Sequence, residues 1–467
     1  MSRSSNSIVA TQGVLRPMVR LAAPVLLEQL LIMAVAFVDQ WLAGQYLQSA
    51  HLAAIGLIWY ILWFIPSIFG LVAIGATALT ARSVGGGRAD EAAAASNQAL
   101  TAGMLVALAT VLLFATCGRL LINAMQLEPH AAELAVRYLI VLLPVFPAIM
   151  IEQVGIASLR GAGDTLSGFG AMLVVNVVNA FVGASLLIGW GPIPQLGWDG
   201  LAIGTASGHV IGAAIVLVLL ARGRAGLKLR IRELSPDWSM IRRLLRIGVP
   251  GGVDMIFIVL CHLWFLSIIN SLGTVAAAAH GLSVRIEALA YMPGVAFQVA
   301  AGTLAGQFLG AGDHRRAMRS VLATCWWGGV VMSTAGLIMY FFNRTLTEFF
   351  LGDQNAPVAD TAAPLLQIVA YSMPCLAMLM IFLGALRGAG DTRWPLAFTF
   401  IGFIGVRIPL AYILAFPEFQ LPLFGWTIPG AGWGVQGAWW AMVADVVLRS
   451  LLMSSRFVSG GWRKIEV

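Results

Sequence analysis

Apolar and polar positions form long blocks along this chain, in which apolar runs alternate with short polar turns. A helix needs about 20 apolar residues to cross a bilayer, and many of the runs reach that length. Six runs precede residue 222 and six follow residue 244. The pattern therefore predicts twelve membrane helices: 17–44, 52–81, 93–118, 132–158, 166–190, 198–221, 245–271, 277–309, 318–343, 361–386, 393–416 and 431–455.

One heptapeptide occurs twice in the chain. Leu-Arg-Gly-Ala-Gly-Asp-Thr occupies residues 159–165 and again residues 386–392, 227 positions later. Other matches keep almost the same offset, such as Pro24 with Pro250 (226 positions). A constant offset over half a chain indicates an internal duplication. Six helices in each half make the two repeats parallel in the membrane.

Composition supports a membrane protein and adds little else. Hydrophobic residues make up 59% of the chain and charged residues 10%, whereas a soluble domain has about 25% charged residues. We therefore predict an all-α polytopic membrane protein of two homologous six-helix lobes, without a removable signal peptide. The scattered cysteines have neither disulfide nor metal-site spacing: Cys117, Cys261, Cys325 and Cys375.

The positions of the basic residues predict the orientation. The net charge is +7, and most arginines fall in alternate loops. Cytoplasmic loops of membrane proteins are enriched in Lys and Arg. With the N-terminus in the cytoplasm, the outer side keeps only Arg119, Arg137 and Arg344. We expect both termini in the cytoplasm and the chain in the cell (inner) membrane.

The same pattern predicts how the chain divides. Residues 1–221 form an N-terminal lobe, 222–244 a cytoplasmic linker and 245–467 a C-terminal lobe. The basic linker lies next to the anionic inner leaflet. Its segment from Trp238 to Arg246 is expected to form a short amphipathic helix there.

Both heptapeptides fall on the cytoplasmic side of this topology. Their glycines permit a tight turn, and the Asp-Thr end suits the N-cap of the following helix. We expect structural roles for Arg160, Asp164, Arg387 and Asp391, with a direct role in gating as the alternative. The Gly-rich loops at 85–87 and 310–312 lack a phosphate-binding Gly-Lys-Thr, so transport would not be driven directly by ATP.

Acids inside membrane helices are costly and point to function. Glu28 and Asp39 in the first helix lie eleven residues apart, which places them on one helix face about 16 Å apart. Both are cation-coupling candidates. Glu28 has a counterpart in Asp254, since each follows its proline by four residues, whereas Asp39 has Phe265. The unmatched acid is the better functional candidate, because symmetric structural demand does not explain it.

Other polar residues in the helices allow both structural and functional interpretations. Arg285 and Glu287 could each pair with a neighbouring helix, and Glu152 could hold Arg160. Arg407 and Asp445 could form a pair between helices. Candidates for lining a substrate cavity, through polar contacts or ring faces that accept flat cations, are Met33, Trp59, Trp63, Asn176, Asn179, Asp254 and His262.

The segment from Pro24 to Asp39, followed by Ala43-Gly44, resembles the first helix of the MATE (multidrug and toxic compound extrusion) transporters. The two heptapeptides and the stretch 298–312 resemble the same family, and the similarity covers essentially the whole chain. It implies a V of two lobes around a central cavity, and efflux of organic cations against inward H⁺ or Na⁺. It also implies that Asp39 is the cation-coupling carboxylate and a possible Na⁺ ligand.

Three positions depart from the family pattern. One branch has a Glu in the seventh helix where this chain has Ile258, and an Asp in the tenth helix near the position of Leu376. Some members have a second acid in the fifth helix, where this chain has Gly183. The resemblance therefore favours coupling through the N-terminal lobe.

We hypothesise a secondary active antiporter that exports small amphipathic or cationic compounds in exchange for H⁺ or Na⁺. The alternative is a flippase for a lipid-linked saccharide or another amphiphile. Nothing in the sequence indicates an enzyme, and we expect no cofactor beyond the coupling ion. The expected partners are small molecules and the lipid bilayer but not nucleic acid, and we expect a monomer.

Overall fold

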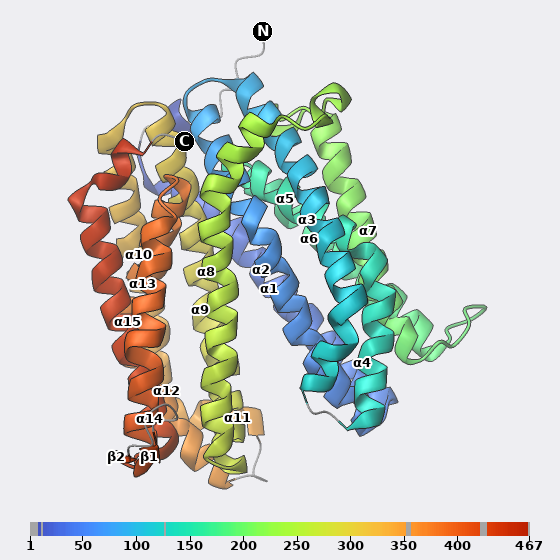
Figure 1. The fold of residues 1–467 in the computed structure, drawn as a ribbon, viewed down its shortest axis with the longest axis vertical. Coiled ribbons are helices and arrows are strands. Elements are labelled where there is room, and N and C mark those ends of the chain that lie inside the picture. The colour runs from blue at the N-terminus through green and yellow to red at the C-terminus, as the bar shows by residue number, and fades with distance from the viewer. Residues whose placement is uncertain (1–7, 11–12, 126–127, 352–355, 421–426, 466–467) are drawn as a thin grey trace.

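The computed structural model describes residues 8–10, 13–125, 128–351, 356–420 and 427–465. Nearly all of them are helical (Figure 1). The helices are α1 (Leu15–Tyr46), α2 (Ser49–Gly85), α3 (Ala89–Ala124), α4 (Pro129–Leu142), α5 (Phe146–Gly161), α6 (Thr165–Ile188), α7 (Trp198–Ala221), α8 (Trp238–Ser271), α9 (Thr274–Gly310), α10 (His314–Phe341), α11 (Asn343–Leu351), α12 (Ala356–Gly388), α13 (Arg393–Gly402), α14 (Ile408–Ala415) and α15 (Gly434–Ser459).

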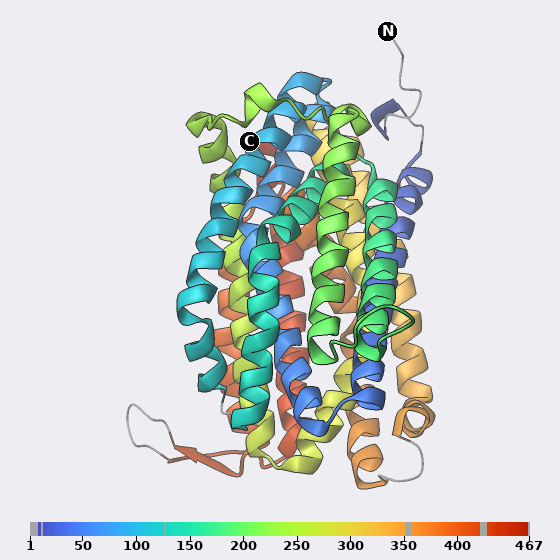
Figure 2. The same ribbon diagram turned by 90° about the vertical axis from the view of Figure 1, so that its right-hand side faces the viewer.

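Short elements join these helices. They comprise η1 (Ile8–Ala10), η2 (Leu143–Val145), η3 (Arg224–Gly226), η4 (Ile231–Leu234), the π-helix η6 (Phe403–Arg407), η7 (Gly461–Lys464), and the strands β1 (Glu418–Gln420) and β2 (Thr427–Pro429). The strands pair antiparallel, with Phe419 opposite Ile428. Their hairpin projects at the end of the molecule opposite the C-terminal segment (Figure 2).

Each predicted membrane helix coincides with a helical segment, so the all-α fold is confirmed. Two predicted helices are divided. The fourth becomes α4, η2 and α5, because Pro144 and Pro147 lack the N–H that a continuous helix needs. The eleventh becomes α13, η6 and α14. Within the described residues, eleven spans are long and apolar enough to cross a membrane. The remaining predicted span is α15, which carries a buried ion-pair cluster.

The predicted boundary of the linker differs from the structure. Helix α8 begins at Trp238, with Asp237 accepting hydrogen bonds from the first backbone amides. Trp238–Arg246 is therefore the first part of a long helix, and the expectation of a separate short helix was wrong. The helix continues because its first turns pack against α2 and α3. The division into lobes 1–221 and 245–467 with a linker at 222–244 stays a prediction, although the helix itself begins at Trp238.

The helices pack around two hydrophobic cores. One contains buried residues from Leu42 to Ile247, and the other contains mainly residues from Phe265 to Trp462. Helix α1 contributes to both, since Met18 and Leu21 near its start join the second core. It packs between α6 and α9. The helix that carries Glu28 and Asp39 therefore touches both groups of helices.

Each heptapeptide clamps the first helix of its own half. The Arg160 guanidinium pairs with Glu28, and Arg387 pairs with Asp254 at 2.6 Å. The threonine hydroxyl that ends each heptapeptide donates to a backbone carbonyl of the helix that carries the paired acid. The acceptor is Arg20 in α1 at 3.3 Å for the first copy and Ile247 in α8 at 2.8 Å for the second. The expected structural role of the turns is thus matched by a repeated set of contacts.

The aspartates of the two heptapeptides bind different partners. Asp164 caps α6 by accepting from the Ser167 amide, as the sequence predicts, and also pairs with Arg224 at 2.5 Å. Asp391 pairs with Arg456 at 2.8 Å, and the backbone amide of Trp394 in the first turn of α13 lies within hydrogen-bonding reach of its carboxylate. Burial raises the pKa of Asp391, and the hydrogen bond from Arg456 opposes that rise.

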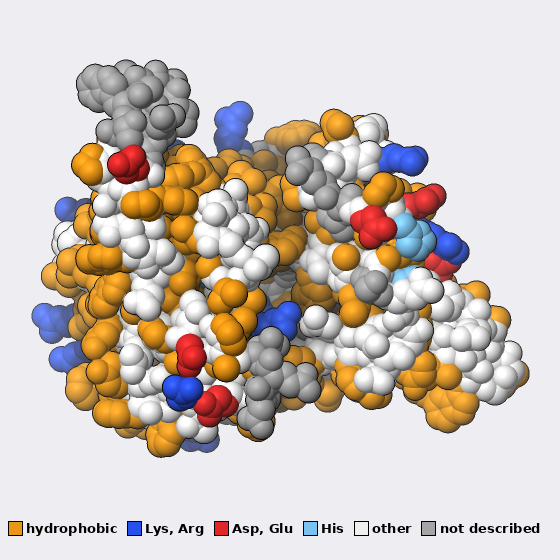
Figure 3. Space-filling view, turned by 90° about the horizontal axis from the view of Figure 1, so that it is seen from below, with side chains coloured by type: hydrophobic (Ala, Val, Ile, Leu, Met, Phe, Trp, Pro, Cys, Tyr) orange, Lys and Arg blue, Asp and Glu red, His pale blue; other side chains and the backbone are white. Residues whose placement is uncertain are grey.

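The two halves interlock at the end that carries the heptapeptides. Gln307 of α9 donates to the Gly161 carbonyl at 2.9 Å, and Arg82 of α2 donates to the Ala389 carbonyl at 3.0 Å. Each turn is therefore bound by a helix of the other half. At the opposite end the groups part, and the surface is hollowed between mainly hydrophobic walls (Figure 3).

Helices α2 and α9 cross so closely at the interlock that only glycine fits. A Cβ at Gly85 would collide with the Gln307 carbonyl, and a Cβ at Gly310 would collide with the Arg82 carbonyl. Both collisions involve backbone, which cannot rotate away as a side chain can. The two contacts are equivalent under an offset of 225, so the crossing has the symmetry of the duplication.

We predict that Gly85→Ala lowers the stability of the protein by roughly 1–3 kcal/mol, the usual cost of overpacking. Gly56→Ala on the same helix is the matched control, because no atom lies within 4 Å of its added Cβ. Melting temperatures of both variants in detergent check this expectation. Equal melting temperatures would contradict the close crossing.

Candidate functional site

Asp39 lies inside the first helix group. Asp39 is 8% exposed, and the side-chain amide of Asn179 on α6 lies within hydrogen-bonding reach of its carboxylate. No ion pair to Asp39 occurs among the described residues. A carboxylate in this setting has lost most of its hydration without gaining a counter-charge. Asp39 is therefore suited to bind a proton or a small cation.

Two residues that the sequence did not single out complete this site. Tyr138 of α4 interacts electrostatically with Asp39, and its hydroxyl forms a buried hydrogen bond of 2.9 Å with the Thr205 hydroxyl of α7. A single Tyr or Thr in an apolar run is common, so neither gave a signal in the sequence. The site thus draws on α1, α4, α6 and α7.

Several polar atoms at the site lack a hydrogen-bond partner among the described residues. The Oδ1 atoms of Asp39 and of Asn179 are buried and lack a hydrogen-bond partner in the described part of the chain, as does Nδ2 of Asn176. A proton on Asp39 or a bound cation would satisfy such oxygens. The donor set fits a proton well and offers Na⁺ few ligands. Among described residues no group of three His, Cys, Asp or Glu forms a metal site.

Gly183 occupies the position where some family members have a second acid. It lies beside the site, with its missing Cβ 3.6 Å from the Asn179 oxygen. Gly204 of α7 packs directly on the Gly183 backbone, where an added Cβ would approach to 2.6 Å. The close packing of α6 on α7 takes the place of a second carboxylate. Asp39 is thus the one acid in contact range of Asn179 among the residues described.

The other acids predicted for coupling or for the cavity lie in ion pairs instead. Glu28 is 3% exposed and bound to Arg160, and Asp254 is fully buried and bound to Arg387. Eleven residues separate Glu28 from Asp39, so the structure does not bring the two acids together. Their predicted roles in coupling and substrate binding remain predictions, but the geometry explains both as counter-charges for the heptapeptide arginines.

Three of the aromatic candidates, Trp59, Trp63 and His262, gather where the two halves face each other. Trp59, Tyr60 and Trp63 of α2 line a recess of about 190 Å³. The Trp63 ring lies 6.0 Å from the His262 ring of α8, measured between centroids. Met33 lies partly exposed on α1. Of the predicted cavity residues, Asn179 thus lies at Asp39, whereas Trp59, Trp63 and His262 lie together elsewhere.

Several predicted partners differ from the observed ones. Glu152 binds His209 of α7 at 2.9 Å and not Arg160. The predicted pair of Arg407 and Asp445 is confirmed at 2.7 Å. Arg285 and Glu287, expected to pair with neighbouring helices, form no ion pair with any described residue. A one-dimensional pattern cannot show which of several acids an arginine reaches.

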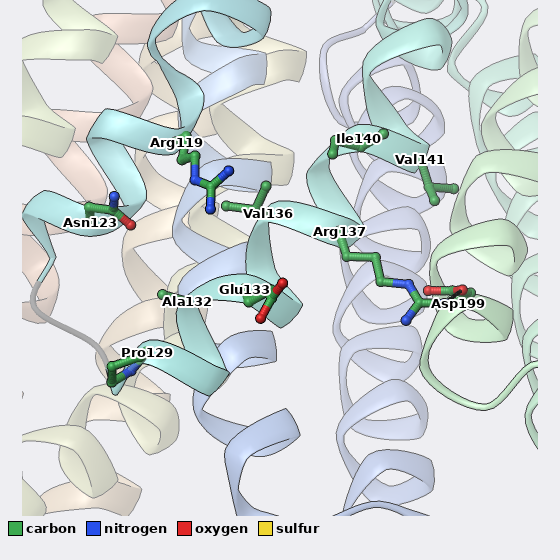
Figure 4. Close-up of a pocket in the computed structure, with 10 residues that line it drawn as sticks. All are labelled: Arg119, Asn123, Pro129, Ala132, Glu133, Val136, Arg137, Ile140, Val141 and Asp199. Atoms are coloured by element: carbon green, nitrogen blue, oxygen red, sulfur yellow. Dashed lines mark hydrogen bonds and ion pairs between the residues drawn. The ribbon is translucent and has the colours of Figure 1, made fainter.

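A further surface pocket lies away from these residues. It has a volume of about 720 Å³ and is lined by α3, α4 and the start of α7, with Arg137 paired to Asp199 at one side (Figure 4). Its walls include Arg119 and Glu133, and they contain none of the residues discussed above as site candidates. We therefore place the candidate functional site at Asp39 and the facing aromatic residues.

A duplicated bundle of membrane helices, joined at one end and open at the other, is the architecture of a secondary transporter. The MatE family pattern matches residues 24–184 and 250–413, which is more than half of the chain. This protein belongs to that family, the MATE transporters. It is a multi-pass membrane protein and not an enzyme.

Individual relatives agree with this assignment. The chain is 28% identical over 97% of its length to a probable multidrug resistance protein NorM of Thermotoga maritima, of which it covers 94%. It is 25% identical over 88% of its length to multidrug resistance protein MdtK of Yersinia pseudotuberculosis, of which it covers 90%. A crystal structure of MATE in complex with MaL6 has the same fold, with 18% identity, a TM-score of 0.86, and coverage of 97% and 100% of the two chains.

We predict that Glu28→Gln lowers the melting temperature in detergent, because it leaves Arg160 without its counter-charge inside the protein. Removing one partner of a buried ion pair costs roughly 3–5 kcal/mol. Asp39→Asn removes an acid without an ion-pair partner and should leave the melting temperature unchanged or higher. The opposite order would contradict the division into structural and functional acids.

Proposed function

We propose that this protein is a secondary active antiporter that exports small amphipathic, often cationic compounds in exchange for H⁺ or Na⁺. The observation that carries the proposal is the buried, unpaired carboxylate of Asp39 in a helix that touches both halves. The Thermotoga and Yersinia relatives are named as multidrug resistance proteins, which supports the same substrate class.

The position of Asp39 suggests how an ion could drive the cycle. A proton on Asp39 removes a charge from the site and supplies an O–H that can donate to the free oxygen of Asn179. This would draw α1 and α6 together. Because α1 also bears Glu28, bound to the Arg160 turn, a change at Asp39 would reach the interlock. With both termini in the cytoplasm, the hollow seen in Figure 3 faces outward.

The aromatic recess of α2 supports an organic cation as substrate. Ring faces attract cations within about 6 Å of the centroid, and flat hydrophobic compounds pack on the same surfaces. The recess is lined by Trp59, Tyr60 and Trp63, and the Trp63 ring lies 6.0 Å from the His262 ring of the other half. We therefore place the aromatic part of a substrate beside α2, with coupling at Asp39.

Asp39→Asn is expected to reduce gradient-driven export by roughly tenfold or more, which corresponds to at least about 1.4 kcal/mol. The protein is reconstituted in liposomes, and efflux of a fluorescent organic cation is followed with a H⁺ or a Na⁺ gradient imposed separately. Asp90→Asn is the matched control, because its side chain is 88% exposed and remote in sequence from the site. Wild-type export by Asp39→Asn would refute coupling at this residue.

A lipid flippase is the second candidate function. The observation that favours it is the surplus of positive charge around Asp445, where two arginines share one carboxylate. We expect the same liposomes to move the fluorescent cation but not a fluorescent phospholipid between leaflets. Lipid movement that exceeds protein-free liposomes, together with no cation efflux, would support the flippase instead.

A further inference from the structure

Glu287 in α9 stands apart from most other acids of the membrane helices. Glu28, Glu152, Asp254 and Asp445 each bind an arginine or a histidine within 4.0 Å. Glu287 forms no hydrogen bond or ion pair with any described residue, although a charge inside a bilayer is costly. Asp39 likewise has no ion-pair partner among the described residues, although the Asn179 amide lies within hydrogen-bonding reach of it. The counterpart of Glu287 in the first half, at an offset of 225, is Leu62, so structural symmetry does not explain it.

Helix geometry directs Glu287 toward the interior of the second helix group. It lies seven residues after His280, and seven residues turn a helix by almost two full turns, which returns to the same face about 10 Å further on. The His280 ring packs on Phe265 at 6.0 Å and on Trp439 at 5.7 Å. Phe265 is the repeat counterpart of Asp39. Glu287 therefore faces the region that corresponds to the Asp39 site.

A buried cluster with surplus positive charge lies in that region. Arg407 and Arg449 both bind Asp445, with N–O distances of 2.7 Å. Two guanidinium groups and one carboxylate leave a charge of +1 on residues that are 3%, 7% and 0% exposed. Burying an uncompensated charge is strongly unfavourable. The cluster therefore requires one further negative charge nearby.

The arginine nearest to this face has an unused donor. Nη1 of Arg407 is buried without a hydrogen-bond partner among the described residues, and its guanidinium lies 5.9 Å from the Phe265 ring centroid. Arg407 interacts electrostatically with Glu287. An ionised Glu287 would supply the missing negative charge, and the total charge of the four residues would be zero.

Arg407 also lies at an irregular turn of the helix. It is the last residue of the π-helix Phe403–Arg407, and π-helical turns inside α-helices occur often at functional sites. At an offset of 227, Phe403 and Val406 correspond to Asn176 and Asn179 of the Asp39 site. The same place in each half thus presents amides around an acid in one case and a cationic cluster in the other.

We propose that Glu287 is a second proton-carrying carboxylate of the transport cycle, with the cluster of Arg407, Asp445 and Arg449 as its fixed counter-charge. This inference rests on the proposed ion-coupled transport. The proton adds to one carboxylate oxygen and later leaves to water, and no other bond changes. A proton on Glu287 removes its attraction to Arg407 and frees α9 to move relative to the π-helix.

The surrounding groups are consistent with this role. Charged or titratable groups on elements around this face of α9 are His262 from α8, Arg387 from α12, Arg407 from η6, Asp445 and Arg449 from α15, and His280 and Tyr291 on α9 itself. Arg387 is already paired with Asp254. Of these groups, the unbound donor of Arg407 is therefore the natural partner of an ionised Glu287.

Infrared difference spectroscopy of the purified full chain tests the proposal directly. A pH step between about 5 and 9 spans the range in which a buried carboxyl changes its protonation state, and a protonated carboxyl has a distinct C=O band. We expect Glu287→Gln, which keeps the side-chain shape, to lose one component of this band, and Asp39→Asn to lose another. Glu287→Asp should restore the component. Asp360→Asn is the control, since this exposed acid lies beside Arg344 at 3.2 Å.

The outcomes separate the two proposals. If Glu287→Gln leaves the wild-type band intact, or if no carboxyl band changes with pH, Glu287 does not carry a proton and the inference is overturned. Liposome export by Asp39→Asn tests the antiport function independently. A lost Glu287 component with undisturbed export by Asp39→Asn would keep the proton site and reject coupling at Asp39. If the protein transports protons, we also expect the Glu287→Gln variant to exchange about one proton fewer than the wild type for each substrate molecule exported.

Discussion

The ion pair of Arg387 with Asp254, at 2.6 Å, shows the constraint on which much of this structure depends. A charged group within a bilayer must pair with an opposite charge or become neutral, because no water is there to solvate it. The duplicated heptapeptides meet this demand in the same way. Each places its arginine against an acid four residues after a proline in the first helix of its half. The pairs fix these helices against the turns and give each buried acid a counter-charge.

The same turns also serve the contact between the two halves. Their backbone carbonyls accept from Gln307 and Arg82, which belong to the opposite half. A turn that is clamped within its own half and bound by the other holds the two halves together at this end. The glycine crossing of α2 and α9 brings the backbones close enough for these hydrogen bonds. Charge pairing within each half and backbone packing between the halves therefore act at one end of the molecule.

The functional candidates lie where the two halves differ. The first half surrounds Asp39 with amides and hydroxyl groups, whereas the corresponding region of the second half has Phe265 and a cationic cluster. A symmetric scaffold accommodates this difference because the helix packing is set by small and apolar residues. The polar groups can then change without changing the fold. The two halves thus carry different charged sites within one scaffold.

The amino-acid sequence by itself determined the number of long helical segments and their duplication, and it singled out Asp39 as an acid without a counterpart in the other half. Apolar length and a constant offset are local properties that do not depend on which helices touch. The sequence also predicted the pair of Arg407 and Asp445, since few charges were available in those two helices.

Only the tertiary structure decided how the remaining charges are shared. Glu28 could have been a coupling acid or a counter-charge, and its contact with Arg160 favours the second. Arg160 could have met Glu152, but α7 brings His209 to that acid instead. Tyr138, Thr205 and the unpaired Glu287 gained meaning only from neighbours on other helices. The physical reason is that an ionic contact depends on distance through space, which packing sets, and a linear pattern gives the charges without their distances.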